Sequence, residues 1–293
     1  MCDSKLFYTV IIIVSLVGIT LSRENLSLTK AEKQKLDQFK DAVSKISFPA
    51  EWMQQELNLV RYLRARQWDV QRAKSMLQET VAWWEENNMK DIHNEDWTSI
   101  EKDYPLHTDG VDKFGQPEVY FCNVMFPQIP SLAFVFAFAE WDLRGAAVQG
   151  RLNRVIRWFF KAFDDVHQKS IEYHKLGKTN GTQWNVIADM DKLSRQQHLC
   201  IQCLRFYTEL ALILESRYPG GSDKLFVVNS PSIFQIVLSL INPILSKSTL
   251  NSLKVIGANK EEWGKAVYSH FAKDQLPENL GGTRKYSTVW NEI

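Results

Sequence analysis

A stretch without a single charge, between Lys224 and Lys247, shows two patterns of hydrophobic and polar residues in succession. Residues 225–229 are apolar or β-branched on both faces, which is typical of a strand covered on both sides in a parallel sheet. Ser230-Pro231 ends this strand, because proline has no N–H to give to a neighbouring strand. After this dipeptide the polar residues recur every three or four positions, and this spacing predicts a helix with one narrow polar stripe.

The predicted helix, residues 232–245, carries more large apolar side chains than one buried stripe needs. Such a helix must be deeply buried or must face something other than water. The Ser230-Pro231 break and Pro243 leave the apolar stretch too short to span a bilayer. The pattern therefore predicts a movable apolar wall, with a hinge near Pro243.

The rest of the chain divides into a helical part and a part in which strands and helices alternate. Residues 28–86 show helical periodicity, with Thr29 and Asp69 as N-caps. Strands are expected at residues 118–124, 183–189, 225–229 and 253–256, and further helices at residues 139–177 and 195–216, the former ending at Gly177. This order predicts an α/β fold: an N-terminal helical bundle, then a mostly parallel sheet with helices packed on it.

The N-terminus resembles a targeting segment. Residues 6–19 are apolar and follow Lys5, and their length matches a signal peptide better than a membrane-spanning helix. Small residues at Thr20 and Ser22 predict cleavage before Arg23 and entry into the secretory pathway, which two glycosylation sequons at residues 25–27 and 180–182 also fit. An uncleaved anchor, or a start assigned upstream of the true one, are the alternatives.

Cysteine usage gives no disulfide framework. Without Cys2, which would leave with the signal, Cys122, Cys200 and Cys203 remain, an odd number. Cys200 and Cys203 have CxxC spacing within a helical pattern, and this favours packing in the core over metal binding or redox chemistry.

No catalytic or cofactor motif is recognisable in the sequence. It lacks the Gly-x-Ser-x-Gly elbow, the Gly-x-Gly-x-x-Gly turn after a strand, and the Gly-x-x-x-x-Gly-Lys-Ser/Thr phosphate loop, and its six histidines lack metal-ligand spacing. Asp189 and Asp191 lie at the end of a predicted strand, and we interpret them as turn and cap residues. The net charge of +1 does not indicate a nucleic-acid partner. We therefore expect no catalytic residue, metal or cofactor.

Two groups of basic residues each have two interpretations. Salt bridges that tie the bundle to the next domain are favoured over phosphate binding for Arg61, Arg64 and Arg66. The residues of the second group lie on one side of the helix expected at residues 139–177. For this basic side of the helix, exposure to solvent is favoured over docking to anionic lipid headgroups. This group comprises Arg144, Arg151, Arg154, Arg157 and Lys161.

Four segments occur in the order seen in the CRAL-TRIO lipid-binding family. They are residues 59–70 (a helical motif with Arg-Ala-Arg), 112–117 (Asp-Lys-Phe-Gly-Gln-Pro), 218–257 (from Tyr-Pro through Val-Val-Asn-Ser-Pro and the apolar helix to a short strand) and 274–283 (Asp-Gln-Leu-Pro-Glu-Asn-Leu-Gly-Gly-Thr). The chain resembles this family over residues 27–283, and is most similar to its supernatant-protein-factor and α-tocopherol-transfer types. The former carry a GOLD β-sandwich afterwards, whereas the present sequence ends at Ile293.

The resemblance, together with the signal-like N-terminus, implies a domain organisation, and the resemblance also implies a function. The expected parts are a signal peptide (1–22), the family's N-terminal helical domain (23–95), its lipid-binding domain (96–285) and a tail (286–293). The expected function is non-enzymatic: one hydrophobic lipid is held in an apolar pocket under the helical lid, which opens at a transient membrane surface. Most members are cytoplasmic, so a cytoplasmic location is the alternative to the secretory one.

The position of residues in the family's lipid-binding elements predicts two sets of site residues. The lipid-binding pocket is expected to be lined by Phe121, Val186, Phe206, Leu210, Phe226, Val228, Phe234, Val237, Leu238 and Ile241. The lid is expected to face the membrane through Leu240, Ile244 and Leu245.

The resemblance also bears on the ligand. Phosphatidylinositol-transfer members tend to carry charge after the Tyr-Pro and before the proline of the lid, where this chain has Gly220 and Asn242. This favours a neutral or weakly polar lipid (tocopherol, retinoid or sterol precursor) or phosphatidylcholine. Two other functions stay open: a lipid-sensing module that regulates a partner enzyme, and an α/β enzyme that acts on a lipid.

Overall fold

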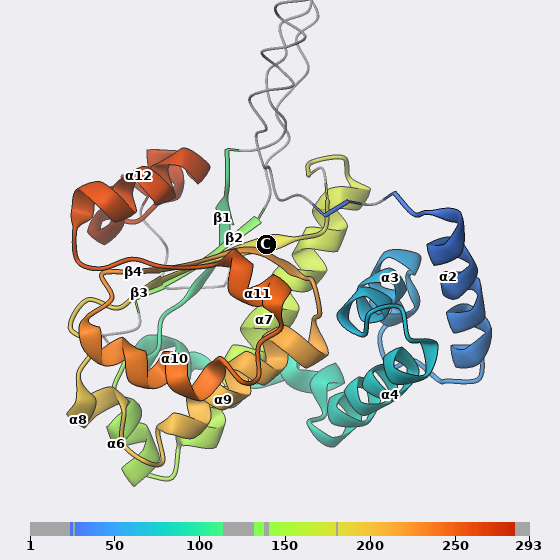
Figure 1. The fold of residues 1–293 in the computed structure, drawn as a ribbon. Helices are drawn as coiled ribbons and strands as arrows, with labels where there is room; N and C mark the ends of the chain where they lie inside the picture. The colour runs from blue at the N-terminus through green and yellow to red at the C-terminus, as the bar shows by residue number, and fades with distance from the viewer. Residues whose placement is uncertain (1–23, 26, 114–131, 138–140, 180, 285–293) are drawn as a thin grey trace, which may run out of the picture.

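The computed structural model describes residues 24–25, 27–113, 132–137, 141–179 and 181–284 (Figure 1). The expected signal segment, the strand expected at residues 118–124 with Phe121, and the tail lie outside the described residues. Within these ranges, no helix is both long enough and apolar enough to cross a membrane.

The N-terminal part is helical, as predicted. Its helices are α2 (Lys30–Val43), α3 (Glu56–Ala65) and α4 (Val70–Glu86), with 3₁₀ turns η1 (Glu51–Gln54) and η2 (Met89–Asn94), followed by α5 (Thr98–Asp103). Thr29 and Glu32 form a reciprocal capping box at the start of α2, and Asp69 caps α4. Leu36, Phe39 and Leu77 belong to a core that these helices bury among themselves.

The second part is built on one sheet. Its described strands are β1 (His107–Val111), β2 (Leu132–Ala137), β3 (Trp184–Asp189), β4 (Ser222–Val228) and β5 (Leu253–Val255), hydrogen-bonded in that order. β1 is antiparallel to β2 and the other neighbours are parallel, which confirms the mostly parallel sheet. β1 and β2 are not among the predicted strands. β2 is a short apolar run, which periodicity does not distinguish from a buried helix, and β1 contains Asp and Gly, which are uncommon in strands.

Alternation along the strands divides the apolar side chains of the sheet between two cores. Val186 and Leu225 belong to the core that faces α9 (Leu204–Leu212) and α10 (Gln235–Ile241). Phe226 and Val228 belong to the core that faces α12 (Lys260–His270). Figure 1 shows α12 on one side of the sheet and α9 and α10 on the other. Both faces of β3 and β4 are thus covered, which confirms for β4 the prediction made for residues 225–229.

The helix expected at residues 139–177 is two helices, α6 (Leu143–Val148) and α7 (Leu152–Lys175). Gly150 separates them with a φ of 69°, a left-handed conformation that glycine adopts at low cost. The break places Arg144 on α6, apart from the other basic residues of its group. α7 ends before Gly177, whose φ of 68° confirms the predicted glycine stop.

The helix expected at residues 195–216 is also interrupted. α8 (Arg195–His198) and α9 are joined by a turn, and the π-helical segment η4 (Ile213–Arg217) follows α9. Cys200 and Cys203 lie at this turn and form a disulfide. The prediction that they pack in the core is confirmed, since Cys203 is buried in the main core and Cys200 packs against it. The expectations of a continuous helix and of no disulfide are wrong. The turn brings their Cα atoms to 4.9 Å, within the range that a disulfide requires, and an odd cysteine count does not exclude a pair so close in sequence.

The basic arc of α7 is bound to carboxylates of the helical part rather than left in solvent. Arg157 donates to Glu95 at 2.8 Å, Arg154 pairs with the same carboxylate, and Arg151 donates to Asp103 at 3.0 Å. These arginines therefore join the two parts of the chain. Neither the favoured solvated face nor headgroup docking describes this arrangement.

A histidine reinforces this junction. His93 of η2 lies between two carboxylates of α7, with Nε2 at 2.7 Å from Asp164 and Nδ1 at 3.1 Å from Asp165. These hydrogen bonds raise the pKa of His93 to about 9, so that its ring is protonated at neutral pH. Asp164 also accepts from the Tyr218 hydroxyl at 3.1 Å. The helical part, α7 and the Tyr218-Pro219 turn are thereby held as one frame.

Candidate functional site

An apolar cavity lies between one face of the sheet and the helices α9 and α10. Its volume is about 80 Å³, and its walls are made of aliphatic and aromatic side chains from β3, β4, α7, α9 and the segment from η5 (Ser232–Phe234) through α10. The polar stripe of α10, with Gln235 and Ser239, is exposed, whereas Val237 is buried against the cavity. The amphipathic pattern of the sequence thus places the apolar face of α10 over the cavity, as a lid.

Half of the predicted lining residues meet in this wall: Val186, Leu210, Phe234, Val237 and Ile241. Leu238 is half-buried and packs on the same core without reaching the wall. Phe206 lies deeper, where its ring meets the rings of Trp141 and Phe159 at centroid distances of 6.2 and 4.8 Å. The position of Phe121 lies outside the described residues.

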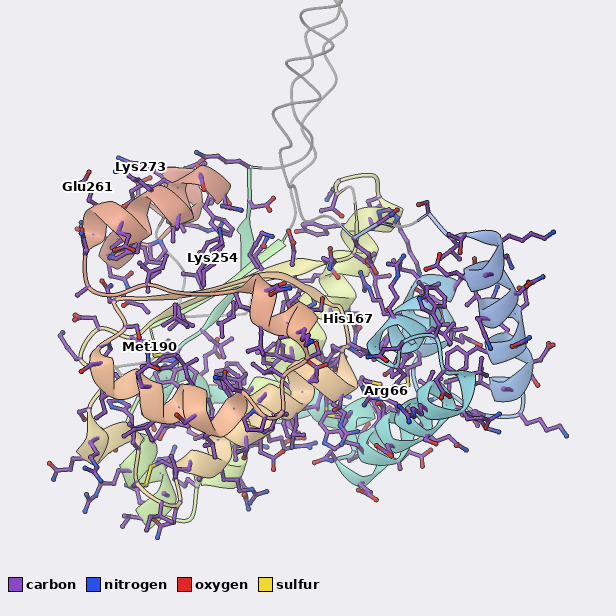
Figure 2. The ribbon with its side chains drawn as sticks, viewed as in Figure 1. Arg66, His167, Met190, Lys254, Glu261 and Lys273 are labelled. Atoms are coloured by element: carbon purple, nitrogen blue, oxygen red, sulfur yellow. A yellow bond between two sulfur atoms is a disulfide. The ribbon has the colours of Figure 1, made fainter. Side chains whose placement is uncertain are left out.

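The two other predicted lining residues face away from the cavity. Phe226 and Val228 alternate with Leu225 and Val227, so they point to α12 while their neighbours line the cavity. Met190, which also lines the cavity, lies between the sheet and α10, whereas Lys254 lies on the α12 side (Figure 2). The sequence shows that alternate residues face opposite sides, but the choice of side depends on the tertiary structure.

The three residues expected to face the membrane do not lie together. Leu240 and Ile244 are half-buried on the lid. Leu245 is buried and lines the cavity, because the chain turns inward after the end of α10. The most exposed large apolar residue of the lid is Ile236, with 42% of its surface exposed.

The volume of the cavity has a direct consequence for any ligand. A cavity of about 150 Å³ holds benzene, and sites for drug-sized ligands measure roughly 300–1,000 Å³. At about 80 Å³ this cavity has no room for a molecule of lipid size. A ligand of that size requires the lid to move away from the sheet.

A buried carboxylate holds the end of the lid. Glu215 of η4 accepts hydrogen bonds from the Ser246 backbone N–H at 2.9 Å and from Thr249 Oγ1 at 2.7 Å. Ser246 is the N-cap of α11 (Lys247–Ser252), so this contact joins the segment after the lid to η4, which follows α9. Sequence reasoning missed Glu215, because a π-helical segment is not visible in a residue pattern.

A polar cleft of about 630 Å³ lies beside the lid hinge, between α3, the Tyr218-Pro219 turn and the start of α11. In its wall the buried Arg61 guanidinium donates to Glu24 at 2.6 Å and to Thr182 Oγ1 at 2.9 Å. This supports the salt-bridge interpretation, since the charge of Arg61 is compensated within the protein. Gly220 has a φ of 66°, and a Cβ there would lie 3.3 Å from Arg61 Cγ, so this position favours glycine.

The aspartate that ends β3 is structural, as predicted. Asp189 accepts hydrogen bonds from Asn229 Nδ2 at 2.8 Å, Asn279 Nδ2 at 2.9 Å and the Asp191 N–H at 3.0 Å. It thereby joins the ends of β3 and β4 to the segment after α12. Lys192 in the same turn has a φ of 64°, a conformation that glycine adopts more easily.

The described residues show no arrangement suited to metal chemistry, since no group of three or more potential ligands lies together among them. His167 is buried between the rings of Trp52 and Tyr218, at centroid distances of 4.6 and 4.9 Å (Figure 2). Burial, and secondarily the charge of Arg61, lower its pKa to about 3, so the ring is neutral. His167 is not part of the cavity wall.

Comparison with known proteins shows which family has this combination of helical part, sheet and apolar cavity. The model of the CRAL/TRIO domain matches residues 130–282, and that of the CRAL/TRIO N-terminal domain matches residues 35–79. The chain belongs to the CRAL/TRIO family. The N-terminal match contains α3 and parts of α2 and α4, and the domain match contains β2 to β5, the cavity wall and the lid.

Individual relatives agree with this assignment. The chain is 26% identical to CRAL-TRIO domain-containing protein T23G5.2 of Caenorhabditis elegans, over 78% of this chain and 30% of that protein. It is 22% identical to Protein real-time of Aedes aegypti, over 87% and 38% of the two chains. It is 24% identical to SEC14 cytosolic factor of Eremothecium gossypii, over 87% and 78%. The chain thus spans about a third of the length of the first two relatives.

A solved structure has the same fold. The chain is similar to the structure titled "Crystal structure of Sfh5", with a TM-score of 0.61 and 13% sequence identity, over 82% of this chain and 85% of that one. CRAL/TRIO proteins bind and transfer hydrophobic lipids and are in general not enzymes. The apolar cavity under α10 is therefore the candidate lipid site of this chain.

We predict that Glu215→Ala loosens the end of the lid. The substitution leaves the Ser246 N–H and the Thr249 hydroxyl without their buried acceptor, which costs about 1–3 kcal/mol of stability. Hydrogen exchange of the amides at residues 242–252 should accelerate about tenfold or more, as measured by mass spectrometry. Glu215→Gln keeps an oxygen acceptor and is the matched control. Unchanged exchange in the alanine variant would show that this carboxylate does not hold the lid.

Proposed function

We propose that the protein binds one hydrophobic lipid in the cavity under α10 and carries it between membranes. The observation that supports this most is the pairing of a fully apolar wall with a lid that leaves only about 80 Å³ when closed. A wall of this kind recognises a ligand by burial of apolar surface, at about 25 cal/mol per Å². A lid that must move to admit the ligand gives the protein two states: an open state, in which the ligand enters or leaves, and a closed state, in which the ligand is carried.

Opening of the lid is best accommodated at a membrane. Moving α10 away from the sheet exposes Phe234, Val237 and Ile241, which are buried or half-buried in the closed state. Exposure of these side chains to water is unfavourable, whereas contact with the interface of a bilayer is favourable. The half-buried Leu240 and Ile244 are the parts of the lid that we propose to insert first.

The surroundings of the lid favour a neutral or weakly polar lipid, or phosphatidylcholine, over an inositol phospholipid. Gly220 and Asn242 carry no charge where phosphatidylinositol-transfer members tend to have it. The backbone and the Arg61 contact at Gly220 disfavour any side chain there. Arg61 itself is already bound to Glu24. Tocopherol-like, retinoid-like and sterol-like molecules are the remaining classes to compare.

We predict that Val237→Trp removes lipid binding. Val237 is 1% exposed and faces the cavity, so an indole at this position fills the space that the ligand needs, at a folding cost of about 1–3 kcal/mol. Lipid carried through purification, measured by native mass spectrometry, should fall from one molecule per chain to nearly none. Ile236→Trp, on the exposed side of the same helix, is the control and should keep its lipid. Equal stoichiometry in both variants would exclude this cavity as the site.

We predict that Leu240→Asp with Ile244→Asp slows transfer between vesicles about tenfold, the equivalent of about 1.4 kcal/mol. Two carboxylates on this part of the lid oppose its insertion into the bilayer, while the cavity wall keeps its residues. Ser239→Asp adds charge on the polar stripe and is the control. Transfer equal to wild type in a folded double variant would show that this part of the lid does not meet the membrane. Tight binding without transfer in the wild type would favour a lipid-sensing module.

We also propose that the chain enters the secretory pathway and is trimmed near Ser22. The apolar residues 6–19 and the two glycosylation sequons at residues 25–27 and 180–182 support this. N-terminal sequencing of protein from its native tissue should find Arg23 or a neighbour as the first residue. An intact Met1 would contradict the proposal.

A further inference from the structure

The disulfide between Cys200 and Cys203 lies at the turn before α9, outside the wall of the cavity. Cys203 is the N-cap of α9, and Cys200 is at the end of the turn closer to α8. The two residues between them, Ile201 and Gln202, are exposed, and Ile201 presents 87% of its surface to solvent. Another protein can therefore approach this turn directly.

The two sulfurs have unequal surroundings. Cys203 is completely buried, whereas Cys200 is partly exposed. The backbone N–H of Cys203 points at Cys200 Sγ, with the nitrogen 3.1 Å from the sulfur. Because Cys200 is the accessible sulfur, an incoming thiolate can reach it, and the shielded Cys203 is its leaving partner. In the reduced pair the same N–H stabilises negative charge on Cys200, and the thiolate is the form of cysteine that attacks an oxidised partner.

The bond contributes little to holding the chain together. A disulfide stabilises a protein mainly by restricting the unfolded chain, and the effect grows with the length of the closed loop. Here the two cysteines are only 3 positions apart. The aromatic packing of Phe206 against Trp141 and Phe159 follows immediately in α9 and does not depend on the bond. The bond can therefore open without loss of the fold.

We propose that Cys200 and Cys203 form a redox-active pair, which exchanges reversibly with a protein dithiol of the thioredoxin or disulfide-isomerase class. A thiolate of that dithiol attacks Cys200 Sγ and forms a mixed disulfide, while the Cys200–Cys203 bond breaks and Cys203 leaves as a thiolate that takes up a proton. The second thiolate of the dithiol then attacks its own neighbour in the mixed disulfide. Cys200 is released and takes up a proton, the dithiol is oxidised, and two electrons have passed to this chain.

The position of the pair connects this chemistry to the cavity. α9 begins directly after Cys203 and places Tyr207, Leu210 and Ala211 in the cavity wall. Opening of the bond removes the covalent constraint on the turn before α9. The N-terminus of α9, the helix that packs under the lid, can then move more freely. The redox state of the pair thereby sets the rate at which a ligand leaves. This step rests on the proposed lipid-binding function, whereas the thiol exchange does not.

The exchange is tested on the full chain with Cys2→Ser and Cys122→Ser, so that only the pair contains sulfur able to react. The oxidised protein is incubated with thioredoxin and its reducing system, then quenched with a maleimide-linked polymer that shifts the protein on a gel. Two thiols should appear without denaturant and disappear again in oxidised glutathione, with an unchanged circular dichroism spectrum. A pair that becomes reducible only in denaturant would overturn the proposal.

The assignment of roles is tested by single substitutions in the same background. Cys203→Ser leaves the partly exposed sulfur of Cys200, and Cys200→Ser leaves the buried one. The first variant should form a mixed disulfide with oxidised glutathione about tenfold faster than the second. Equal or reversed rates would overturn the assignment of Cys200 as the sulfur that exchanges with a partner.

The connection to the cavity is tested with a nitrobenzoxadiazole-labelled phosphatidylcholine as probe. Its dissociation rate should change about threefold on reduction of the pair, and the Cys200→Ser, Cys203→Ser double variant should not respond to the reductant. A rate that is insensitive to complete reduction would overturn this connection. If the probe does not bind at all, the proposed function fails for this lipid class while the thiol measurements still decide the redox chemistry.

Discussion

The proposed function depends on one contact, the packing of α10 on the sheet and α9. For this function the apolar face of α10 must be hydrophobic enough to close over the sheet in water and must separate from it to admit a ligand. Both requirements fall on Phe234, Val237 and Ile241, which line the cavity from the lid. Because the closed cavity measures only about 80 Å³, the closed state is stabilised by contacts between protein side chains, and a bound lipid must replace those contacts.

The rest of the molecule restricts movement to this one side. The opposite face of the sheet is packed against α12 through Phe226 and Val228, and Asp189 joins the strand ends to the segment after α12. The helical part is held to α7 by the arginines around Glu95 and by His93. Against this frame, the lid is attached at its far end through Glu215. A single buried carboxylate is a contact that can open while the frame stays intact.

Much of the architecture could be predicted because it depends on local patterns. The capping box at Thr29, the stop at Gly177, the strands β3, β4 and β5, and the apolar lid after Ser230-Pro231 follow from residue type and period alone. Interruptions in helices were missed where they depend on backbone conformation. Gly150 adopts a positive φ, and the turn at Cys200 and Cys203 ends α8, although the apolar period continues through both places.

The sequence by itself determined the helical N-terminal part, the strands β3 to β5, the apolar lid and, through four motifs, membership of the CRAL/TRIO family. Only the tertiary structure decided which face of each element meets the cavity. Period-2 alternation shows that Val227 and Val228 point in opposite directions, but the choice of side depends on whether α10 or α12 covers it. The partners of Arg61, Glu215 and Cys200 were decided in the same way. Arg61 and Glu215 contact segments that tertiary packing brings close to them, and Cys200 meets Cys203 because of the path of a turn. Residue periodicity encodes neither the packing nor the path of the turn.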